Sequence, residues 1–501
     1  MALPNPINSL KRFPNEILHQ IIADVDGRPP VTLYQLITVN RFCHDVVRQH
    51  PAWCQNLYLE YTNKRALGIF NSQLVACKER KRPTDVDILL LGRHDIDVDI
   101  HKQVFVEIMA ILPFIKTLRL TVRLDDPQAL WQQFSSIPAL QLESLDFNLI
   151  NHQHGSLEAL VLPAHPFSGQ APLLKYINAN FDYRSPSVTP FTTVESVCWE
   201  VCQRLDAGIL RGSNIAAQYP KARKLVFDEA EYGNLPLDLF SGAVGLWQLE
   251  DIEIWGVRKP ALLENILSHL VTSSTRRISI DGQYTWGDPT GAGLFSSCLP
   301  LGEPLSFKAL MLSEHYELFA LSLSTVRMES SRTIELRGDR LMGHIGDCVH
   351  IMLMQSFSSR LASVTRLEFD LRLWNQILKS DVSFSAVHTL VIYVSKTPFW
   401  EKLHLKPDLN RLDDSGFFPL DQSTYIPLIT RLEIIGTAAR CVRVEETWIA
   451  QFVASCMSGF DTTASPVILR CLKLMTTSGT LEHVSGWPRL SSDDCEVVKS
   501  K

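Results

Sequence analysis

The sequence of 501 residues lacks the marks of several large classes of protein. Its N-terminus has no apolar run of signal-peptide type, because prolines and asparagines interrupt the stretch from Leu3 to Leu10. Even a strongly apolar run such as Val86 to Leu91 is far too short to span a membrane. The eleven cysteines include no C-x-x-C pair, which indicates free thiols in a reducing compartment. We therefore expect a protein of the cytoplasm or the nucleus that makes no membrane contact.

Motifs for catalysis and for cofactor binding are also missing. The sequence contains no G-x-x-x-x-G-K-[ST], no G-x-S-x-G and no H-E-x-x-H. Its cysteines and histidines do not have the spacing of a zinc site. The formal net charge of −6 argues against a general nucleic-acid binder, which would carry a basic stripe. These absences predict a non-enzymatic chain with no cofactor, no metal and no nucleic-acid partner.

Three short helices with apolar faces are predicted between Phe13 and Leu59. Pro14 suits the first turn of a helix, and apolar residues then recur at helical spacing. The stretch from Asp26 to Pro30 ends the first helix, and a second helix runs to about Val39 before a third begins near Phe42. So small a unit cannot bury this much apolar surface alone, and we expect a neighbour to cover part of it.

The order of residues in this stretch resembles an F-box. That family's pattern runs Leu-Pro-x-Glu-Ile/Leu-Leu-x-x-Ile, then leucines, then Val-Ser/Cys-Arg and an aromatic residue. The sequence departs from it at Phe13, which replaces the usual Leu, and at Cys43, which stands where the aromatic residue is usual. The resemblance implies docking on a Skp-family adaptor, and through it on a cullin. The residues that it assigns to the adaptor interface are Phe13, Pro14, Ile17, Leu18, Ile21, Leu33, Leu36, Val39 and Phe42.

A unit of the form apolar-x-x-apolar-x-apolar recurs along the rest of the chain, with most neighbouring copies about 20 to 35 residues apart. Each copy predicts a strand, and stretches between copies, such as Ala129–Phe134, Ala261–Leu270 and Trp448–Val453, predict helices. The copies resemble leucine-rich repeats, although the usual Asn or Cys after the strand is largely missing. The copies are Ile115/Leu118/Leu120, Leu142/Leu145/Phe147, Leu174/Ile177/Ala179, Val194/Val197/Trp199, Ala222/Leu225/Phe227, Leu249/Ile252/Ile254, Thr275/Ile278/Ile280, Phe307/Leu310/Leu312, Ser331/Ile334/Leu336, Val364/Leu367/Phe369, Val387/Leu390/Ile392, Ile429/Leu432/Ile434 and Leu469/Leu472/Leu474.

The predicted fold class is α/β, with a small three-helix F-box-like unit followed by an irregular leucine-rich-repeat-like α/β solenoid, or horseshoe. A helix is expected over Tyr58–Arg82, ending in the basic run Lys78–Arg82, which is typical either of a solvated helix end or of a nuclear localisation signal. The predicted organisation is a flexible leader at 1–12, an F-box-like domain at 13–60, a helical linker at 61–84, a solenoid at 85–490 and a polar, frayed tail at 491–501.

In such an array, the residues beside the inward-facing apolar pair lie on the face that meets a partner. At these positions the sequence is rich in acidic residues with aromatic residues among them, which favours a protein target with a basic patch. The predicted target-binding residues are Arg119, Asp146, Glu253, Trp255, Glu335, Glu368, Asp370, Tyr393 and Glu433.

Together the two segments resemble fungal-type F-box proteins with degenerate repeats. The resemblance implies the substrate-recognition subunit of an SCF-type cullin–RING E3 ubiquitin ligase, which binds a protein target that the sequence does not identify. Two alternatives stay open. One is a leucine-rich-repeat scaffold unrelated to ubiquitin, whose N-terminal helices cap the solenoid. The other is an enzyme on an α/β fold, which needs a deep pocket with converging polar groups.

Overall fold

The structure is a computed structural model, and the part of the chain that it describes has an α/β fold. The chain divides into two compact units, Met1–Leu249 and Glu250–Lys501, called here the N-terminal unit and the C-terminal unit. Their boundary lies inside the stretch that the sequence assigned to one array. The described residues are 41–60, 64–90, 98–124, 126–151, 160–179, 181, 191–201, 212–229, 239–240, 242–243, 245, 247–257, 260–281, 298–299, 302–313, 318–326, 332–338, 358–373, 384–394, 429–436, 442–445, 449, 453, 460, 465–470, 472–476, 490–493 and 496–499.

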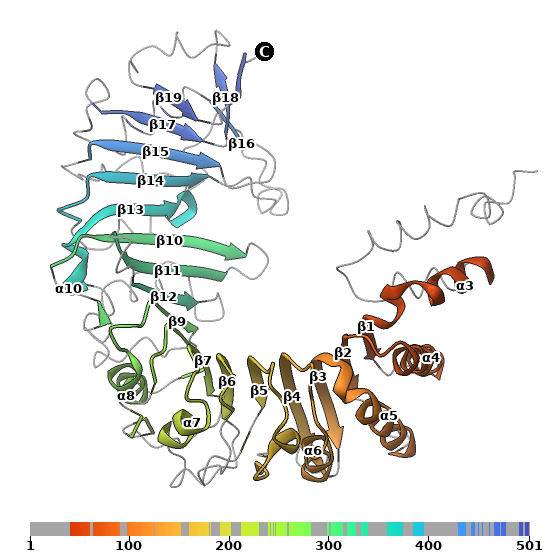
Figure 1. The fold of residues 1–501 in the computed structure, drawn as a ribbon. Helices are drawn as coiled ribbons and strands as arrows, with labels where there is room; N and C mark the ends of the chain where they lie inside the picture. Colours follow the sequence, from red (N-terminus) through yellow and green to blue (C-terminus); the bar gives the residue numbers. More distant parts are fainter. Residues whose placement is uncertain are drawn as a thin grey trace, which may run out of the picture. The chain divides into compact units, whose positions relative to one another are not determined.

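The N-terminal unit is built on parallel strands that follow one another in chain order. Each strand from β1 to β7 pairs in parallel with the next. In Figure 1, α5 and α6 lie on the same side of β2, β3 and β4. The strands are β1 (Asn56–Glu60), β2 (Thr84–Leu90), β3 (Ile115–Leu124), β4 (Ser144–Asn151), β5 (Tyr176–Ala179), β6 (Ser196–Val201) and β7 (Lys224–Glu229). The helices are α3 (Arg41–Gln49), η3 (Pro51–Cys54), α4 (Lys64–Arg80), α5 (Val98–Ile111), η4 (Leu112–Phe114), α6 (Pro127–Ser135), η5 (Pro166–Gly169) and α7 (Gly212–Gln218).

Local sequence explains why α6 forms where it does and what it buries. The Asp126 side chain accepts a hydrogen bond from the backbone N–H of Ala129 at 2.8 Å, and Pro127 stands at the first turn. Trp131 is fully buried beside Phe147, with ring centroids 5.6 Å apart, and its Nε1 donates to the carbonyl of Val161 at 3.0 Å. The helix therefore covers the sheet through one apolar face.

A recurring turn stands before many of the strands and explains the first apolar residue of the repeated pattern. In this turn, the backbone N–H of the first pattern residue donates to the carbonyl three residues earlier, and that residue is buried. The turns therefore supply regular packing where the asparagine ladder of regular repeats is missing. They run over 139–142, 171–174, 191–194, 219–222, 272–275 and 384–387.

The C-terminal unit is also mainly parallel, but its strand order is interrupted once. Strands β13, β14, β15, β17 and β19 pair in parallel in that order, and β16, β18 and β20 form a separate parallel sheet. The strands are β8 (Asp251–Trp255), β9 (Arg277–Asp281), β10 (Leu305–Ser313), β11 (Leu318–Thr325), β12 (Thr333–Gly338), β13 (Val364–Asp370), β14 (Thr389–Val394), β15 (Arg431–Gly436), β16 (Val442–Glu445), β17 (Val467–Arg470), β18 (Leu472–Thr476), β19 (Leu490–Asp493) and β20 (Glu496–Lys499). The helices are α8 (Pro260–Leu270), α10 (Ser358–Leu361) and η11 (Leu371–Leu373).

The interruption is a set of three antiparallel strands, β10, β11 and β12. β11 pairs antiparallel with both β10 and β12, while β12 lies parallel to β9 and β10 lies parallel to β13. The spatial order is therefore β9, β12, β11, β10, β13. The Arg332 guanidinium fixes the start of β12 by donating to the carbonyls of Thr272, Thr275 and Cys298 at 2.5, 2.9 and 2.7 Å.

Most strands and helices that the sequence predicted are confirmed. Every repeat copy coincides with a strand, and the helices expected at 129–134 and 261–270 are α6 and α8. Apart from Leu310 on β10, the pattern residues whose burial the structure describes are buried.

Several details of the prediction were wrong. On β10 the buried residues are Leu305, Phe307 and Ala309, whereas Leu310 is half-exposed, so the predicted copy was in the wrong register. The last copy combined residues of two strands, since Leu469 belongs to β17 and Leu472 to β18, which lies in the other sheet. β11 was not predicted. The helix expected from residue 58 starts only after β1. The C-terminal segment, which was expected to be frayed, contains the strands β19 and β20.

Candidate interaction surfaces

A row of polar residues crosses four neighbouring strands of the N-terminal unit. Asp87, Arg119, Asp146 and Asn178 are directly paired positions on β2, β3, β4 and β5. Arg119 donates from Nε to Asp146 at 3.2 Å and from Nη1 to Asp87 at 3.4 Å. Asn178 donates to the other oxygen of Asp146 at 3.0 Å. The sheet thus brings two predicted target-binding residues, Arg119 and Asp146, into direct contact.

The charges of this row differ in how much water they meet. The Asp146 side chain is only 15% exposed, whereas that of Arg119 is 56% exposed. Burial raises the pKa of Asp146, and the neighbouring Arg119 offsets only part of that rise. The guanidinium is therefore the charge that the centre of the row presents to solvent.

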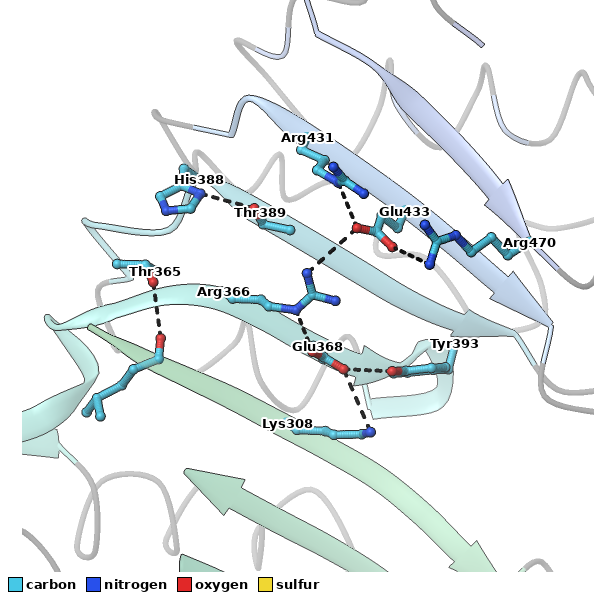
Figure 2. Close-up of polar contacts among 11 residues, drawn as sticks. Lys308, Thr365, Arg366, Glu368, His388, Thr389, Tyr393, Arg431, Glu433 and Arg470 are labelled. Atoms are coloured by element: carbon cyan, nitrogen blue, oxygen red, sulfur yellow. Dashed lines mark hydrogen bonds and ion pairs between the residues drawn. The ribbon is translucent and has the colours of Figure 1, made fainter. Parts of the chain in front are cut away.

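A larger polar network lies on the C-terminal unit, where its members come from β10, β13, β14, β15 and β17 (Figure 2). Strand pairing puts Lys308, Glu368, Val391 and Glu433 side by side on β10, β13, β14 and β15. The network residues are Lys308, Arg366, Glu368, Tyr393, Arg431, Glu433 and Arg470. It contains three predicted target-binding residues, Glu368, Tyr393 and Glu433.

Glu433 is the hub of the network. Its side chain is 2% exposed and meets three guanidinium groups, as Figure 2 shows. Arg431 donates from Nε at 2.7 Å, while nitrogens of Arg366 and Arg470 lie 3.7 and 3.8 Å away. Because Arg366 starts on β13 and Glu433 on β15, the Arg366 side chain crosses β14, where Val391 is fully buried. A buried carboxylate with several cationic partners is well compensated for the water that it loses.

Glu368 is the second internal carboxylate, with a side chain 12% exposed. It accepts hydrogen bonds of 2.6 Å from Arg366 Nε and from the Tyr393 hydroxyl. Burial opposes its ionisation, but these hydrogen bonds and the nearby charges outweigh burial, so the pKa of Glu368 is lowered. Burial and the hydrogen bond to Glu368 both raise the pKa of Tyr393. The Lys308 Nζ lies 5.1 Å from the centre of the Tyr393 ring, which adds a cation–π contact.

The other predicted target-binding residues do not form an acidic face. Glu253 and Asp370 are buried, at 8% and 3% exposure, and Glu335 forms an ion pair with Arg277. Trp255 is half-exposed on β8. The side chains that reach water beside the buried carboxylates are Arg366, Arg431 and Arg470, at 35, 42 and 39% exposure. The carboxylates of this surface therefore face inward, so the acidic face from which a partner with a basic patch was predicted is not present here. The partner itself stays a prediction.

Sequence reasoning missed the arginines of the network, although one signal was present. The tetrapeptide Thr-Arg-Leu-Glu occurs at 365–368 and again at 430–433. In both copies Arg and Glu are two residues apart on a strand, so they share a face. The Arg-to-Glu hydrogen bonds are correspondingly alike, at 2.6 and 2.7 Å. The pattern therefore identified the pairs, but it did not show which partner is exposed.

The predicted adaptor-binding residues from Phe13 to Val39 lie outside the described residues, and Phe42 lies in α3.

The segment at residues 41–60 packs closely against the first parallel strands. β1 pairs with β2, Gln73 donates to the carbonyl of Trp53 at 2.9 Å, and Trp53 itself is buried. Arg80 donates to the carbonyls of Arg48, Gln49 and His50 at 2.9, 3.2 and 3.0 Å. Residues 41–60 are thus part of the N-terminal unit's packing.

The basic run at 78–82 serves in part to hold this region together. Lys78 forms an ion pair with Glu107 on α5, and Arg80 binds the carbonyls at the end of α3. Two buried thiols, Cys54 and Cys77, lie beside Arg80. Contact with Cys77 and the charge of Arg80 lower the pKa of Cys54 to about 6, against the opposing effect of burial. A cationic neighbour has this effect on a thiol generally.

No protein-family model matches the chain, and no curated protein matches it in a sequence search. Among the described helices, none has the length and apolar character needed to cross a membrane. Within the described ranges, no three His, Cys, Asp or Glu side chains are grouped so that they could hold a metal ion.

Proposed function

We propose that the chain is the substrate-recognition subunit of an SCF-type cullin–RING E3 ubiquitin ligase. In this proposal residues 13–60 form an F-box that docks on a Skp-family adaptor, and the strands form a leucine-rich-repeat-like solenoid that binds a target protein. The chain itself performs no bond chemistry. It raises the effective concentration of the target's lysines near the ubiquitin-loaded enzyme.

The observation that carries the proposal is the repeated stacking within each unit. Most copies of one apolar pattern bury the same positions and pair in parallel with a neighbour, and many begin with the same turn. Such units cannot close a core singly, and stacked in an array they offer a continuous polar face. The in-register polar row of the N-terminal unit and the network of the C-terminal unit are the faces that the proposal assigns to a target.

A second candidate is a scaffold protein without a link to ubiquitin, whose N-terminal helices cap the array. One observation favours it: residues 41–60 are tied to the first parallel strands through β1 and through Arg80 and Gln73. A cap buries Leu18, Ile21 and Leu36 against the first strands, whereas an F-box leaves part of this set exposed for the adaptor. The exposure of these three side chains therefore separates the two candidates.

The test is capture of a purified Skp-family adaptor by the purified full-length chain. The double variant Leu18→Asp, Leu36→Asp puts two charges on the apolar face that the proposal assigns to the adaptor, and it is expected to abolish capture through desolvation of those charges. The matched control is Val75→Asp, Val106→Asp, because both valines are more than half exposed, at 53% and 57%. The control variant should bind like the original chain.

Circular dichroism must show that both variants are folded. Capture by the original chain and by the control, with loss in the Leu18 and Leu36 variant, supports the ligase subunit. Failure of the original chain to bind any Skp-family adaptor rejects it and leaves the capped scaffold as the better candidate.

A further inference from the structure

We propose that the network on β10, β13, β14, β15 and β17 is a docking site for an acidic peptide segment of a partner protein. The inference rests on the proposed function in one respect, since it names the chemistry of the target that the C-terminal unit would bind. It reverses the expectation from composition. The overall charge of the chain is −6, yet the network holds four cations and two carboxylates, and both carboxylates are internal.

The arginines have donors left for a ligand. Arg431 contacts Glu433 through Nε, which leaves both of its terminal NH2 groups for other acceptors. Arg366 uses Nε for Glu368 and Nη1 for Glu433, which leaves Nη2. A guanidinium has five N–H donors in a fixed fork and binds carboxylates in a bidentate manner. Because the internal carboxylates already orient these side chains, less conformational entropy is lost when a ligand binds.

The spacing suits an extended peptide that crosses the strands. Neighbouring strands lie about 4.8 Å apart, so Arg366 on β13 and Arg431 on β15 start roughly 10 Å apart. In an extended peptide, residues two or three positions apart are separated by about 7 to 10 Å. Two or three acidic side chains of one segment can therefore reach the exposed guanidinium groups together. A basic segment would meet those same groups first and would be repelled.

The experiment uses the purified full-length chain and a fluorescein-labelled peptide of about 12 residues with alternating Glu and Ser, followed by fluorescence anisotropy. We expect binding that weakens about tenfold as salt rises from about 50 to 500 mM, because ion pairs at a surface are screened. The variants Arg431→Gln and Arg366→Gln should each weaken binding about fivefold or more, which corresponds to the loss of one charge-assisted contact.

The matched control is Arg276→Gln, the same change at an exposed arginine of the same unit that lies outside the network. It should leave the affinity unchanged. If Arg431→Gln loses its fold because Glu433 is left without its closest partner, the double variant Arg431→Gln, Glu433→Gln takes its place. That variant buries no unpaired carboxylate but still lacks the exposed guanidinium.

Four results would overturn the inference, and the first three concern the peptide and its control. They are failure of the acidic peptide to bind, equal weakening by the Arg276 control, and tighter binding of a peptide with Lys in place of Glu. Binding of only a phosphoserine version of the peptide would also reject it, because the site would then require phosphate. Adaptor capture is measured on the same preparation. Loss of peptide binding with intact adaptor capture refutes this inference alone, whereas failed adaptor capture refutes the proposed ligase subunit.

Discussion

Replacing Glu433 by Ala should loosen the sheet around β13, β15 and β17. The change removes the 2.7 Å hydrogen bond from Arg431 and the two longer ion pairs with Arg366 and Arg470. A hydrogen bond to a charged group contributes about 1.5 to 3 kcal/mol. The longer pairs add less than about 1 kcal/mol each, because the exposed arginines regain water once they are released. The expected cost is therefore about 3 kcal/mol, and Glu433→Gln, which keeps an acceptor for Arg431, should cost roughly half of that.

The two units make global unfolding a poor measure of this cost, since a single free energy of unfolding is not defined for such a chain. Hydrogen exchange read strand by strand is better suited. A cost of about 3 kcal/mol raises the exchange rate of amides in β13–β17 on the order of 100-fold. Amides of β2–β4, in the other unit, are the internal control and should not change. Acceleration of less than about threefold in β13–β17 would show that Glu433 is not the hub described here.

Two further predictions concern pH and the N-terminal packing. Burial raises the pKa of Asp146, so its ionisation costs stability as pH rises above the usual carboxyl pKa of about 3.8. Hydrogen bonds and nearby charges outweigh burial and lower the pKa of Glu368, so its ionisation stabilises the fold above about pH 4.5, and this contribution is lost as pH falls. Asp146→Asn should therefore remove a fall in the stability of the N-terminal unit on raising pH, and Glu368→Gln should remove a fall in the stability of the C-terminal unit on lowering it. Hydrogen exchange read strand by strand between about pH 3 and 7, corrected for the intrinsic effect of pH on exchange, checks both, and an unchanged pH dependence would contradict them. Arg80→Met should speed hydrogen exchange in α3, at a cost of about 2 kcal/mol, because three carbonyls lose a charged donor. The exposed Arg82→Met is its control, and equal acceleration by both changes would refute the anchoring role.

Periodic apolar residues allowed the strands to be predicted, because each strand buries alternate side chains and the pattern repeats. Val364, Leu367 and Phe369, for example, are fully buried as expected. Where the apolar residues fit two registers, the pattern did not decide between them. Phe307 was correctly placed, but Leu310 was chosen over Leu305 and Ala309. Periodicity of two does not encode strand direction, so it could not reveal the antiparallel pairing of β11.

The surface was less predictable than the core for a physical reason. The charge that a strand face presents to solvent depends on which long side chains lie over shorter ones. These contacts form between residues that are distant in the sequence. Arg366 reaches Glu433 across β14, so a contact 67 positions away (433 − 366) determines that the carboxylate is internal. Composition counted Glu368 and Glu433 as acidic surface, whereas the packed sheet presents the arginines.

The three antiparallel strands β10, β11 and β12 also bear on the order in which the C-terminal unit assembles. The contacts between β10 and β11 and between β11 and β12 join strands adjacent in the chain, so only short loops must close. The contacts of β12 with β9 and of β10 with β13 require much longer loops. We therefore expect the trio to form before its contacts with β9 on one side and β13 on the other. During synthesis, β8 and β9 emerge first and can pair with each other, but the other edge of β9 stays unpaired until β12 has emerged.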